Sequence, residues 1–316
     1  MAFTDLTVFE QAGILRRFIP GLEKRLKEDH PELVSLTLGN RERGGKVMED
    51  ELTLKAVVRE KLAQPVNPLP SSITLRTRAR AATQEESAAA IEIPIDVVSF
   101  PTSELTSAAN VFAVNATGCL AGRILWANGG RAWLTVSHLL KFPGGATVNA
   151  LTTRDGVRLP RAKGALWLQD PLQPGYPIDA TAVVEEEDMQ RYAAWTAAKI
   201  DSKIWTQQLN GLRGFYFVDQ KGEFHALRYH TTCRAGIVQF TGGGYYPLVH
   251  LFQSDYAPYG GDSGGPVWLE YQQNQYLVGI QSGVTEGNFI VIPIDCVSRA
   301  FRNAGVMSGI WFKPLS

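Results

Sequence analysis

The sequence predicts a mainly β domain, built as a barrel or a sandwich, that follows a small α+β module. From about Thr106 onward, short apolar runs alternate with glycine-containing turns, a pattern typical of barrels and sandwiches. Two of these runs, Cys119–Trp126 and Arg131–Ser137, flank Asn128-Gly129, which is the strongest short-range hairpin signal. The first hundred residues mix helical and strand patterns instead. These observations divide the chain into residues 1–100 and 101–316.

The α+β module is expected to begin with helical segments. Asp5–Phe18 has amphipathic spacing, and Asp5 is a candidate N-cap. Pro20-Gly21 is expected to break this helix before a second charged turn, Leu22–Glu28. The module therefore starts with one short helix and a separate helical turn.

Three strands and a linker are expected in the rest of the module. The strand candidates are Leu33–Leu38, Leu52–Val58 and Ile91–Val98. The last is expected at a sheet edge, because Pro94 has no N–H to donate to a central ladder. The stretch Ala79–Ala90 is rich in Ala, Glu, Arg and Ser, which indicates a linker or a short exposed helix.

The β domain is expected to contain many short strands and few helices. Besides the hairpin, the strand candidates are Thr147–Thr152, Gly214–Val218, Glu223–Tyr229, Ala235–Phe240, Leu248–Phe252, Pro266–Leu269, Gln275–Ser282 and Asn288–Ile294. Glu186–Gln208 contains neither Gly nor Pro, so a helical insertion is predicted at about 186–208. Val297–Ala304 predicts a closing helix.

Charge and composition argue against some classes of partner. Lys+Arg and Asp+Glu both number 31, so the formal net charge is zero and neither nucleic acid nor an anionic membrane is an expected partner. No apolar run approaches the roughly 18 residues that span a bilayer. The charged N-terminus lacks the apolar run of a signal peptide. An odd count of three cysteines favours a reducing compartment, so a cytoplasmic location is expected.

Neither a metal nor another cofactor is predicted. His225, His230 and Cys233 lie close in sequence, but their spacing is not a standard zinc pattern. The three cysteines, Cys119, Cys233 and Cys296, are expected to be buried thiols.

The most informative motif is Gly-Asp-Ser-Gly-Gly-Pro at residues 261–266, followed by an apolar strand. A hydroxyl is a poor nucleophile unless a base takes its proton and preorganised donors bind the developing oxyanion. Glycines let the backbone bend so that the amides of Gly261 and Ser263 point into one pocket. Ser263 is therefore the predicted nucleophile, and those two amides are the predicted oxyanion hole. The competing interpretation is a glycine-rich turn with an exposed serine.

Chain order excludes the α/β-hydrolase interpretation of the same motif. Residues 261–265 match the G-x-S-x-G nucleophile elbow, but those enzymes place the histidine after the serine. All five histidines of this chain precede Ser263, namely His30, His138, His225, His230 and His250. No elbow-type triad can be completed.

His138 is the predicted general base. It follows the apolar strand Ala132–Val136, so it is held rigidly and can still face a cleft. The alternative is a hydrogen-bonded core histidine. His225, His230 and His250 keep the subtilisin order of Asp, His, Ser formally open, although that fold needs an α/β alternation that the sequence lacks.

Asp179 is the predicted third member, which orients the imidazole and stabilises its protonated form. It stands at the start of the apolar run Ile178–Val184, where a carboxylate is costly unless it has a partner. The alternative is a loop-end aspartate that caps a turn. Weaker candidates are Asp155, Asp170 and Asp201.

The order His138, Asp179, Ser263 and the motif around the serine resemble the trypsin-like (chymotrypsin-fold) serine peptidases. Within them, the chain is most similar to the intracellular Narrow leaf 1-like and bacterial trypsin-like peptidases, which carry an N-terminal segment of strands. The resemblance implies a mainly β fold, a chymotrypsin-like double β-barrel preceded by the small α+β module. It places the histidine and aspartate on the first barrel and the serine on the second.

The resemblance also implies substrate-binding positions. Ser282 and Gly283 match the strand whose serine supports the catalytic aspartate and whose backbone pairs with substrate. Ala257 stands where trypsin has an aspartate, so a preference for Arg or Lys is not expected. Asp262 is expected to find a partner other than a new N-terminal amine, and activation is then independent of cleavage.

The sequence thus predicts a serine endopeptidase that acts on protein or peptide substrates through an acyl-enzyme, intracellular and regulated. The alternative is a protease-fold peptide-binding module with weak or no catalysis. The α+β module is a candidate site for a regulatory protein partner.

Overall fold

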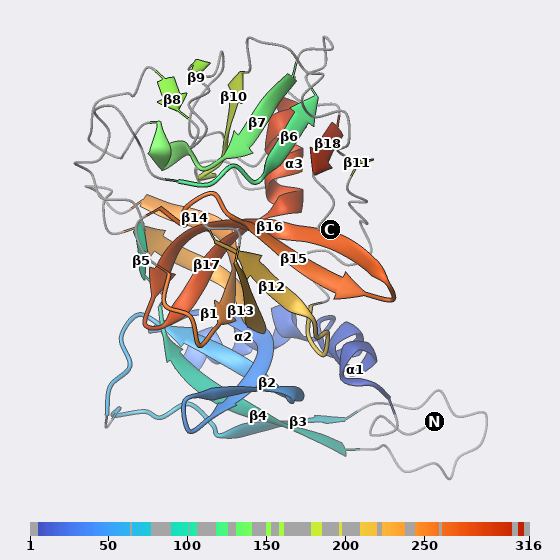
Figure 1. The fold of residues 1–316 in the computed structure, drawn as a ribbon. Helices are drawn as coiled ribbons and strands as arrows, with labels where there is room; N and C mark the ends of the chain where they lie inside the picture. The colour runs from blue at the N-terminus through green and yellow to red at the C-terminus, as the bar shows by residue number, and fades with distance from the viewer. Residues whose placement is uncertain are drawn as a thin grey trace. The chain divides into compact units, whose positions relative to one another are not determined.

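The structure is a computed structural model (Figure 1). It describes residues 6–63, 65–76, 90–100, 102–105, 118–125, 131–140, 150–152, 158–160, 178–184, 196–197, 209–219, 223–237, 244–258, 261–304 and 309–312. The chain is mainly β, as its sequence predicts, with three α-helices among the described residues. None of the described helices is long and apolar enough to cross a membrane.

The chain divides into two compact units. The first contains residues 1–100 together with two later segments, Gln207–Leu212 and Tyr229–Cys233. The second contains Pro101–Thr206, Arg213–Arg228 and Arg234–Ser316. The sequence pattern did not indicate that segments far beyond residue 100 complete the first unit, because such segments join it only through tertiary pairing.

Helix α1 (Val8–Leu15) is capped by Thr7, not by the predicted Asp5, which lies outside the described residues. The Thr7 side chain accepts from the Glu10 amide, and the Glu10 carboxylate accepts from the Thr7 amide, which together form a capping box. Two orphan amides at the helix start are satisfied in this way. The nearer Thr-x-x-Glu pattern therefore determines where the helix starts.

Helix α2 (Ile19–Asp29) contains the Pro20-Gly21 pair that was expected to lie outside a helix. That expectation was wrong because Pro20 falls in the first turn, where a backbone N–H has no intrahelical acceptor. Leu22 is buried and packs with residues of α1 in one apolar core.

The sheet of the first unit has the order β1-β2-β4-β3. Its strands are β1 (Leu33–Arg43), β2 (Lys46–Val58), β3 (Ser72–Arg76) and β4 (Ala90–Ser99). The first two form a hairpin around Gly44-Gly45, both with positive φ, and each strand extends toward this turn beyond its predicted range. Buried residues of α1, α2 and the sheet, among them Leu15, Leu36 and Leu54, form one core.

Strand β4 lies between β2 and β3, so the prediction that it is an edge strand was wrong. Pro94 pairs with Ser72 of β3, and the parallel ladder with β2 begins one residue later, at Ile95. The missing N–H of the proline therefore falls just outside the ladder with β2, which explains why an internal strand tolerates it.

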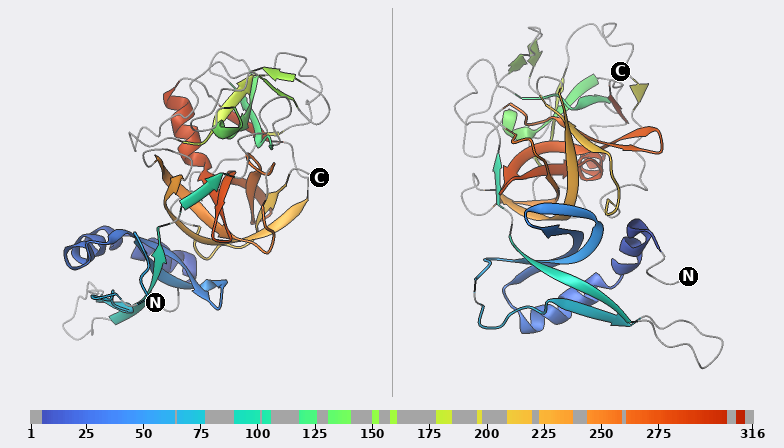
Figure 2. Two further views of the ribbon diagram at one scale, coloured as in Figure 1. Left: turned by 90° about the vertical axis from the view of Figure 1, so that its left-hand side faces the viewer. Right: turned by 60° about the horizontal axis from the view of Figure 1, so that its bottom comes forward.

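The core of the second unit is a closed barrel of six antiparallel strands (Figures 1 and 2). The strands are β12 (Phe215–Val218), β13 (Phe224–Ile237), β14 (Gly244–Gln253), β15 (Pro266–Tyr271), β16 (Asn274–Thr285) and β17 (Asn288–Pro293). They follow the order β12-β15-β16-β17-β14-β13, and β13 returns to pair with β12. Closure pairs the two edges of the sheet with each other through β12 and β13.

A second sheet has the order β10-β7-β6-β18-β11. Its strands are β6 (Gly122–Leu125), β7 (Arg131–Thr135), β10 (Thr181–Val184), β11 (Thr196–Ala197) and β18 (Gly309–Phe312). Two further short strands, β8 (Ala150–Thr152) and β9 (Arg158–Pro160), pair with each other. The predicted hairpin forms between β6 and β7.

Only two residues of the predicted helical insertion at 186–208 are described, and they form strand β11. Their pairing with β18 prevails over the helical propensity of the stretch. The rest of the insertion lies outside the described residues, as does most of the Ala79–Ala90 linker. The closing helix is α3 (Ile294–Asn303), which starts three residues earlier than predicted.

Candidate active site

His138 lies in a 3-10 turn, η2 (Ser137–Leu139), directly after strand β7. The turn follows the extended residue Val136. Ser137 donates a 2.9 Å hydrogen bond to the carbonyl oxygen of Ala180, which fixes the turn to the start of β10. The His138 side chain is fully buried.

Asp179 binds His138 at two points. The carboxylate Oδ1 accepts from the His138 amide at 3.0 Å, and Oδ2 lies 2.6 Å from the ring Nδ1. The register of β7 and β10 explains why His138 and Asp179 are in contact, because Thr135 lies opposite Thr181 in an antiparallel ladder. His138 follows the end of one strand and Asp179 precedes the start of the other, so both stand at the same end of the ladder.

Ser282 completes the surroundings of this carboxylate. Its hydroxyl, on strand β16, donates a 2.5 Å hydrogen bond to Oδ2 of Asp179. All three side chains are fully buried. A buried carboxylate is destabilised unless hydrogen bonds replace its lost hydration. His138 contributes two contacts to Asp179, and Ser282 contributes one. The contact of Nδ1 with the carboxylate fixes the orientation of the ring, and Nε2 is the nitrogen at the opposite edge of the ring.

Ser263 lies in a tight turn that leads into strand β15. Gly265 donates to the carbonyl oxygen of Asp262 at 3.0 Å, and both Gly261 (φ 114°) and Gly264 (φ 89°) have positive φ. These angles strongly favour glycine. Ser263 is buried together with its neighbours in the turn.

Two sets of hydrogen bonds hold the backbone of the Ser263 turn to residues near His138 and Ser282 in the sequence. In the first, Cys119 donates its amide to the Ser263 carbonyl at 2.7 Å, and Thr135 donates its hydroxyl to the Cys119 carbonyl at 2.7 Å. Thr135 is three residues before His138. In the second, Gly264 donates to the Gln281 carbonyl at 2.8 Å, and Gln281 precedes Ser282. The backbone of the serine turn is thus anchored beside both partners.

The predicted oxyanion residues, Gly261 and Ser263, lie in this same turn and are separated by one residue. The carbonyl of Gly261 accepts a 3.4 Å hydrogen bond from the thiol of Cys119. The role of their amides as an oxyanion hole stays a prediction.

Cys119 is no competing nucleophile. Burial raises the pKa of its thiol far above neutrality, and the neighbouring Asp262 adds to this effect. A protonated, buried thiol is inert. Cys233 and Cys296 are buried as well, and burial raises the pKa of Cys233 to about 12.

Tyr256 holds the residue before the serine. Its hydroxyl donates a 2.7 Å hydrogen bond to Oδ2 of the buried Asp262. One partner of this aspartate is therefore an internal phenol, whereas the resemblance led us to expect a partner other than a new N-terminal amine. The sequence gives no indication of this role for Tyr256, because a tyrosine seven positions before the serine carries no recognisable signal.

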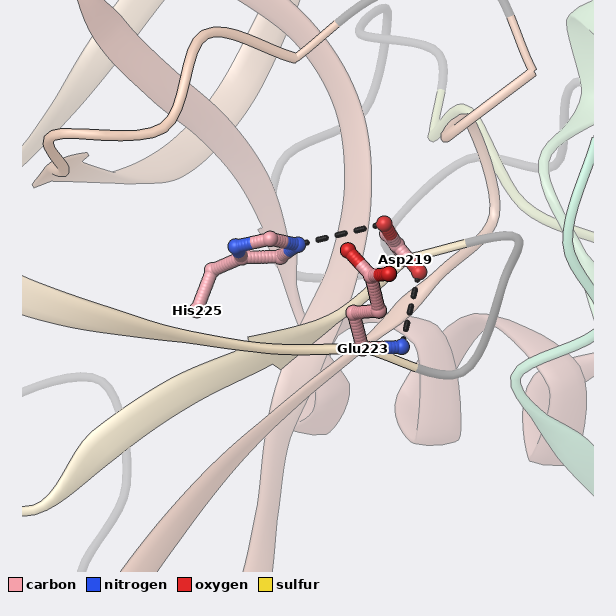
Figure 3. A group of neighbouring side chains, drawn as sticks. All are labelled: Asp219, Glu223 and His225. Carbon is pink, nitrogen blue, oxygen red and sulfur yellow. Dashed lines mark hydrogen bonds and ion pairs between the residues drawn. The ribbon is translucent and has the colours of Figure 1, made fainter.

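The ring of His225 stacks on the ring of Tyr256, with ring centroids 3.7 Å apart and planes 12° from parallel. Its Nε2 lies 3.1 Å from Oδ2 of Asp219, whose Oδ1 accepts from the Glu223 amide at 2.9 Å (Figure 3). Asp219, Glu223 and His225 are the one group of described residues whose ligand atoms could surround a metal ion. Asp219 thereby holds the His225 ring that stacks on Tyr256.

The other candidate residues lie elsewhere. His250 is buried on β14, opposite Val291 and edge-on to Phe252. His230 belongs to the first unit, with Nε2 3.8 Å from a Glu42 carboxylate. Asp155, Asp170 and Asp201 lie outside the described residues.

The three predicted substrate-binding positions differ in their surroundings. Ala257 is exposed in the segment after β14 and adjoins Tyr256. Ser282 contacts Asp179, as expected from the resemblance. Gly283 is buried in β16 and pairs with Ile290 on one side and Leu105 on the other.

Comparison with known proteins yields structural neighbours alone. No family model matches the chain, and no curated protein matches it. The Rv3671c protease of M. tuberculosis in its active form is 14% identical with a TM-score of 0.37, over 72% of this chain and 96% of that one. Its inactive form is 14% identical with a TM-score of 0.34, over 65% and 98%. An inactive mutant of the murine norovirus NS6 protease is 14% identical with a TM-score of 0.31, over 59% and 95%.

Proposed function

We propose that this chain is a serine endopeptidase with Ser263 as nucleophile, His138 as general base and Asp179 as the residue that orients the base. One observation carries the proposal. The Asp179 carboxylate holds His138 at two points and accepts from Ser282, while the Ser263 turn is anchored beside both by hydrogen bonds. Structural cores rarely contain this combination, since a buried histidine–carboxylate pair is costly to build.

The chemistry follows from the roles of these groups. Oγ of Ser263 attacks the peptide carbonyl as His138 takes its proton at Nε2, and Asp179 stabilises the imidazolium. The amides of Gly261 and Ser263 bind the oxyanion. His138 then gives the proton to the leaving amine, which departs and leaves an acyl-serine. A water molecule, deprotonated by His138, attacks the ester, and the acid product leaves with Ser263 reprotonated.

The finer features of the proposal concern substrate, family and location. The substrate is a protein or peptide that binds along β16 near Ser282 and Gly283. The position of Ala257 supports no preference for basic residues at the cleavage site.

We place the enzyme among the intracellular Narrow leaf 1-like and bacterial trypsin-like peptidases because of the motif around Ser263, and we expect cytoplasmic action. The buried thiols support a reducing environment. The α+β unit is the proposed contact for a regulatory protein.

A small fluorophosphonate tests the nucleophile. The unaltered chain should be labelled at Ser263, located by peptide mass spectrometry, and Ser263→Ala should remain unlabelled. Ser263→Ala should also lower peptide-library cleavage by about a million-fold, as the loss of a triad serine does in comparable enzymes.

Ser72→Ala is the matched control. The hydroxyl of Ser72 donates to the exposed Glu92 carboxylate in the first unit, so labelling and cleavage should persist. Lack of labelling in the folded unaltered chain would count against the enzyme and in favour of a peptide-binding module.

A further inference from the structure

Strand β16 has two different neighbours at Gly283 and Val284. On one edge these residues pair with Ile290 and Phe289 of β17. The ladder between β16 and β15 ends at Ile280, opposite Pro266. Beyond the end of that ladder, on the edge of β16 opposite β17, Gly283 and Val284 pair with a short strand, β5 (Thr102–Leu105). A segment from far upstream in the sequence thus fills this stretch of the barrel edge.

Strand β5 is paired on a second barrel strand as well. Its first two residues, Thr102 and Ser103, pair in parallel with Gly236 and Ile237 at the end of β13. Its last two residues pair with β16 in the antiparallel direction. Main-chain ladders from two strands therefore bind four residues of extended chain. Such a slot recognises an extended peptide mainly through its backbone, so it tolerates many sequences.

This slot adjoins the candidate catalytic groups. Leu105 lies opposite Gly283, the residue after Ser282, whose hydroxyl donates to Asp179. Gln281, the residue before Ser282, pairs with Gly264 and Gly265 of the serine turn. The antiparallel direction places the C-terminal end of β5 at the Ser282 end of the slot. A peptide bound in this direction would therefore run toward Ser263.

We propose that β5 is an internal occupant of the slot where an extended peptide substrate binds, and that substrates must displace it. The location of the slot is inferred from the strand pairing. Its effect on catalysis rests on the proposed function. Substrate then binds only the fraction of molecules whose slot is empty, so its apparent affinity falls in proportion to that fraction. A partner that withdraws residues 102–105 would activate the enzyme without any cleavage.

The test is peptide binding in trans. All proteins carry Ser263→Ala to prevent turnover, and the probe is a fluorescein-labelled synthetic peptide of residues 98–109. Glu104→Pro with Leu105→Pro removes both amide hydrogens of the part of β5 that pairs with β16. In the matched control, Glu104→Ala with Leu105→Ala, both amides remain.

Fluorescence anisotropy should show that the proline variant binds the probe at least about tenfold more tightly than the parent, as expected if the slot is mostly occupied. The alanine variant should resemble the parent. A probe that itself has proline at both positions should not bind. Equal affinities for parent and proline variant, or no binding to either, would overturn the proposal.

Hydrogen exchange of the chain without slot mutations provides a second measurement. Amides of Thr102–Leu105 should be protected, since both ladders engage them. Exchange of these amides at the rate of free coil would contradict the pairing.

Fluorophosphonate labelling separates the two proposals. Labelling of Ser263 together with equal probe affinities would reject the occupant and keep the enzyme. Tight probe binding to the proline variant without labelling in the unaltered chain would reject the enzyme and keep the slot.

Discussion

The hydroxyl of Ser282 donates a 2.5 Å hydrogen bond to the carboxylate of Asp179, although 103 positions separate the two residues. This bond joins a strand of the closed barrel to the start of β10 in the second sheet, within one compact unit. It binds the same oxygen, Oδ2, that faces the His138 ring. Ser282 therefore acts on the candidate base through the carboxylate.

Removal of that hydroxyl should slow catalysis without weakening substrate binding. A hydrogen bond to a charged group contributes about 1.5–3 kcal/mol, and the His138 amide still holds Asp179. We expect Ser282→Ala to lower kcat about tenfold, which corresponds to about 1.4 kcal/mol. KM should change less than about twofold, measured on a substrate taken from a peptide library. An unchanged kcat would show that the bond has no part in positioning the base.

The Tyr256–Asp262 bond should support the serine turn. Tyr256→Phe keeps the ring stacked on His225 and removes only the hydroxyl that binds the buried carboxylate. We expect a loss of about 1–3 kcal/mol in unfolding free energy, with slower fluorophosphonate labelling of Ser263. Urea denaturation and labelling kinetics measure the two effects.

Tyr271→Phe is the matched control for this prediction. Its hydroxyl accepts a hydrogen bond from the exposed Gln272 side chain, so the change should stay within about 0.5 kcal/mol. Equal losses in both variants would mean that the Tyr256 hydroxyl has no particular role.

A pair of glycine substitutions should reveal how closely the serine turn approaches its neighbours. Gly264 and Gly287 have similar positive φ values, 89° and 79°. A Cβ on Gly264 would lie 2.3 Å from the Cys119 carbonyl oxygen and 2.5 Å from the Thr135 hydroxyl, whereas a Cβ on Gly287 would meet nothing within 4 Å.

Both substitutions to alanine carry the backbone cost of about 1–2 kcal/mol. We expect Gly264→Ala to lose a further 1–3 kcal/mol or so, and with it fluorophosphonate labelling, because the serine turn must move away. Thermal or urea unfolding measures the difference. Similar losses in the two variants would contradict the close approach.

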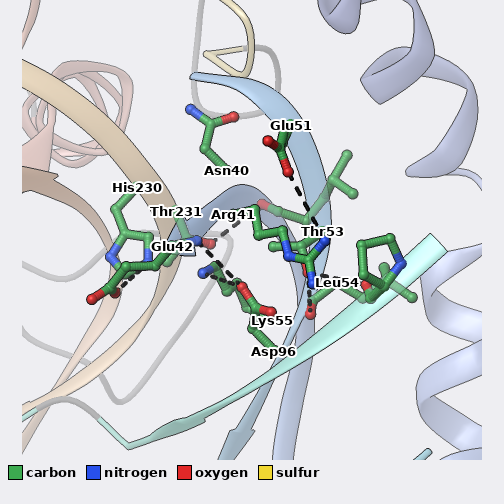
Figure 4. Close-up of polar contacts among 12 residues, drawn as sticks. Asn40, Arg41, Glu42, Glu51, Thr53, Leu54, Lys55, Asp96, His230 and Thr231 are labelled. Carbon is green, nitrogen blue, oxygen red and sulfur yellow. Dashed lines mark hydrogen bonds and ion pairs between the residues drawn. The ribbon is translucent and has the colours of Figure 1, made fainter. Parts of the chain in front are cut away.

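The buried Lys55 should make the first unit more stable at alkaline pH. Its ammonium donates a 3.0 Å hydrogen bond to Asp96 (Figure 4). Burial lowers the pKa of Lys55 below its ordinary value of 10.5, although Asp96 opposes the shift. Between the lowered pKa and 10.5 the unfolded chain binds more protons, so the unfolding free energy rises with pH in this window.

Lys55→Met should remove this alkaline rise. Hydrogen exchange of amides in β1 and β2 is the suitable measurement, because all seven tryptophans of the chain lie outside residues 1–100. The same pH slope in the variant and the parent would contradict the assignment to Lys55.

Local sequence patterns predicted much of the fold. Alternating apolar residues identified β1, β2 and most barrel strands, because each strand buries one face or both in a core. Errors arose where two local signals competed. Thr7 caps α1 instead of Asp5, and Pro20 lies inside α2, since the position of a residue within a helix start decides its effect.

The sequence by itself determined the residue types and the chain order from which Ser263, His138 and Asp179 were chosen. Only the tertiary structure decided that Tyr256 holds Asp262, that Cys119 supports the Ser263 backbone, and that β5 pairs with β16. These contacts join segments far apart in the chain. They depend on strand register and barrel closure, which local residue patterns do not specify.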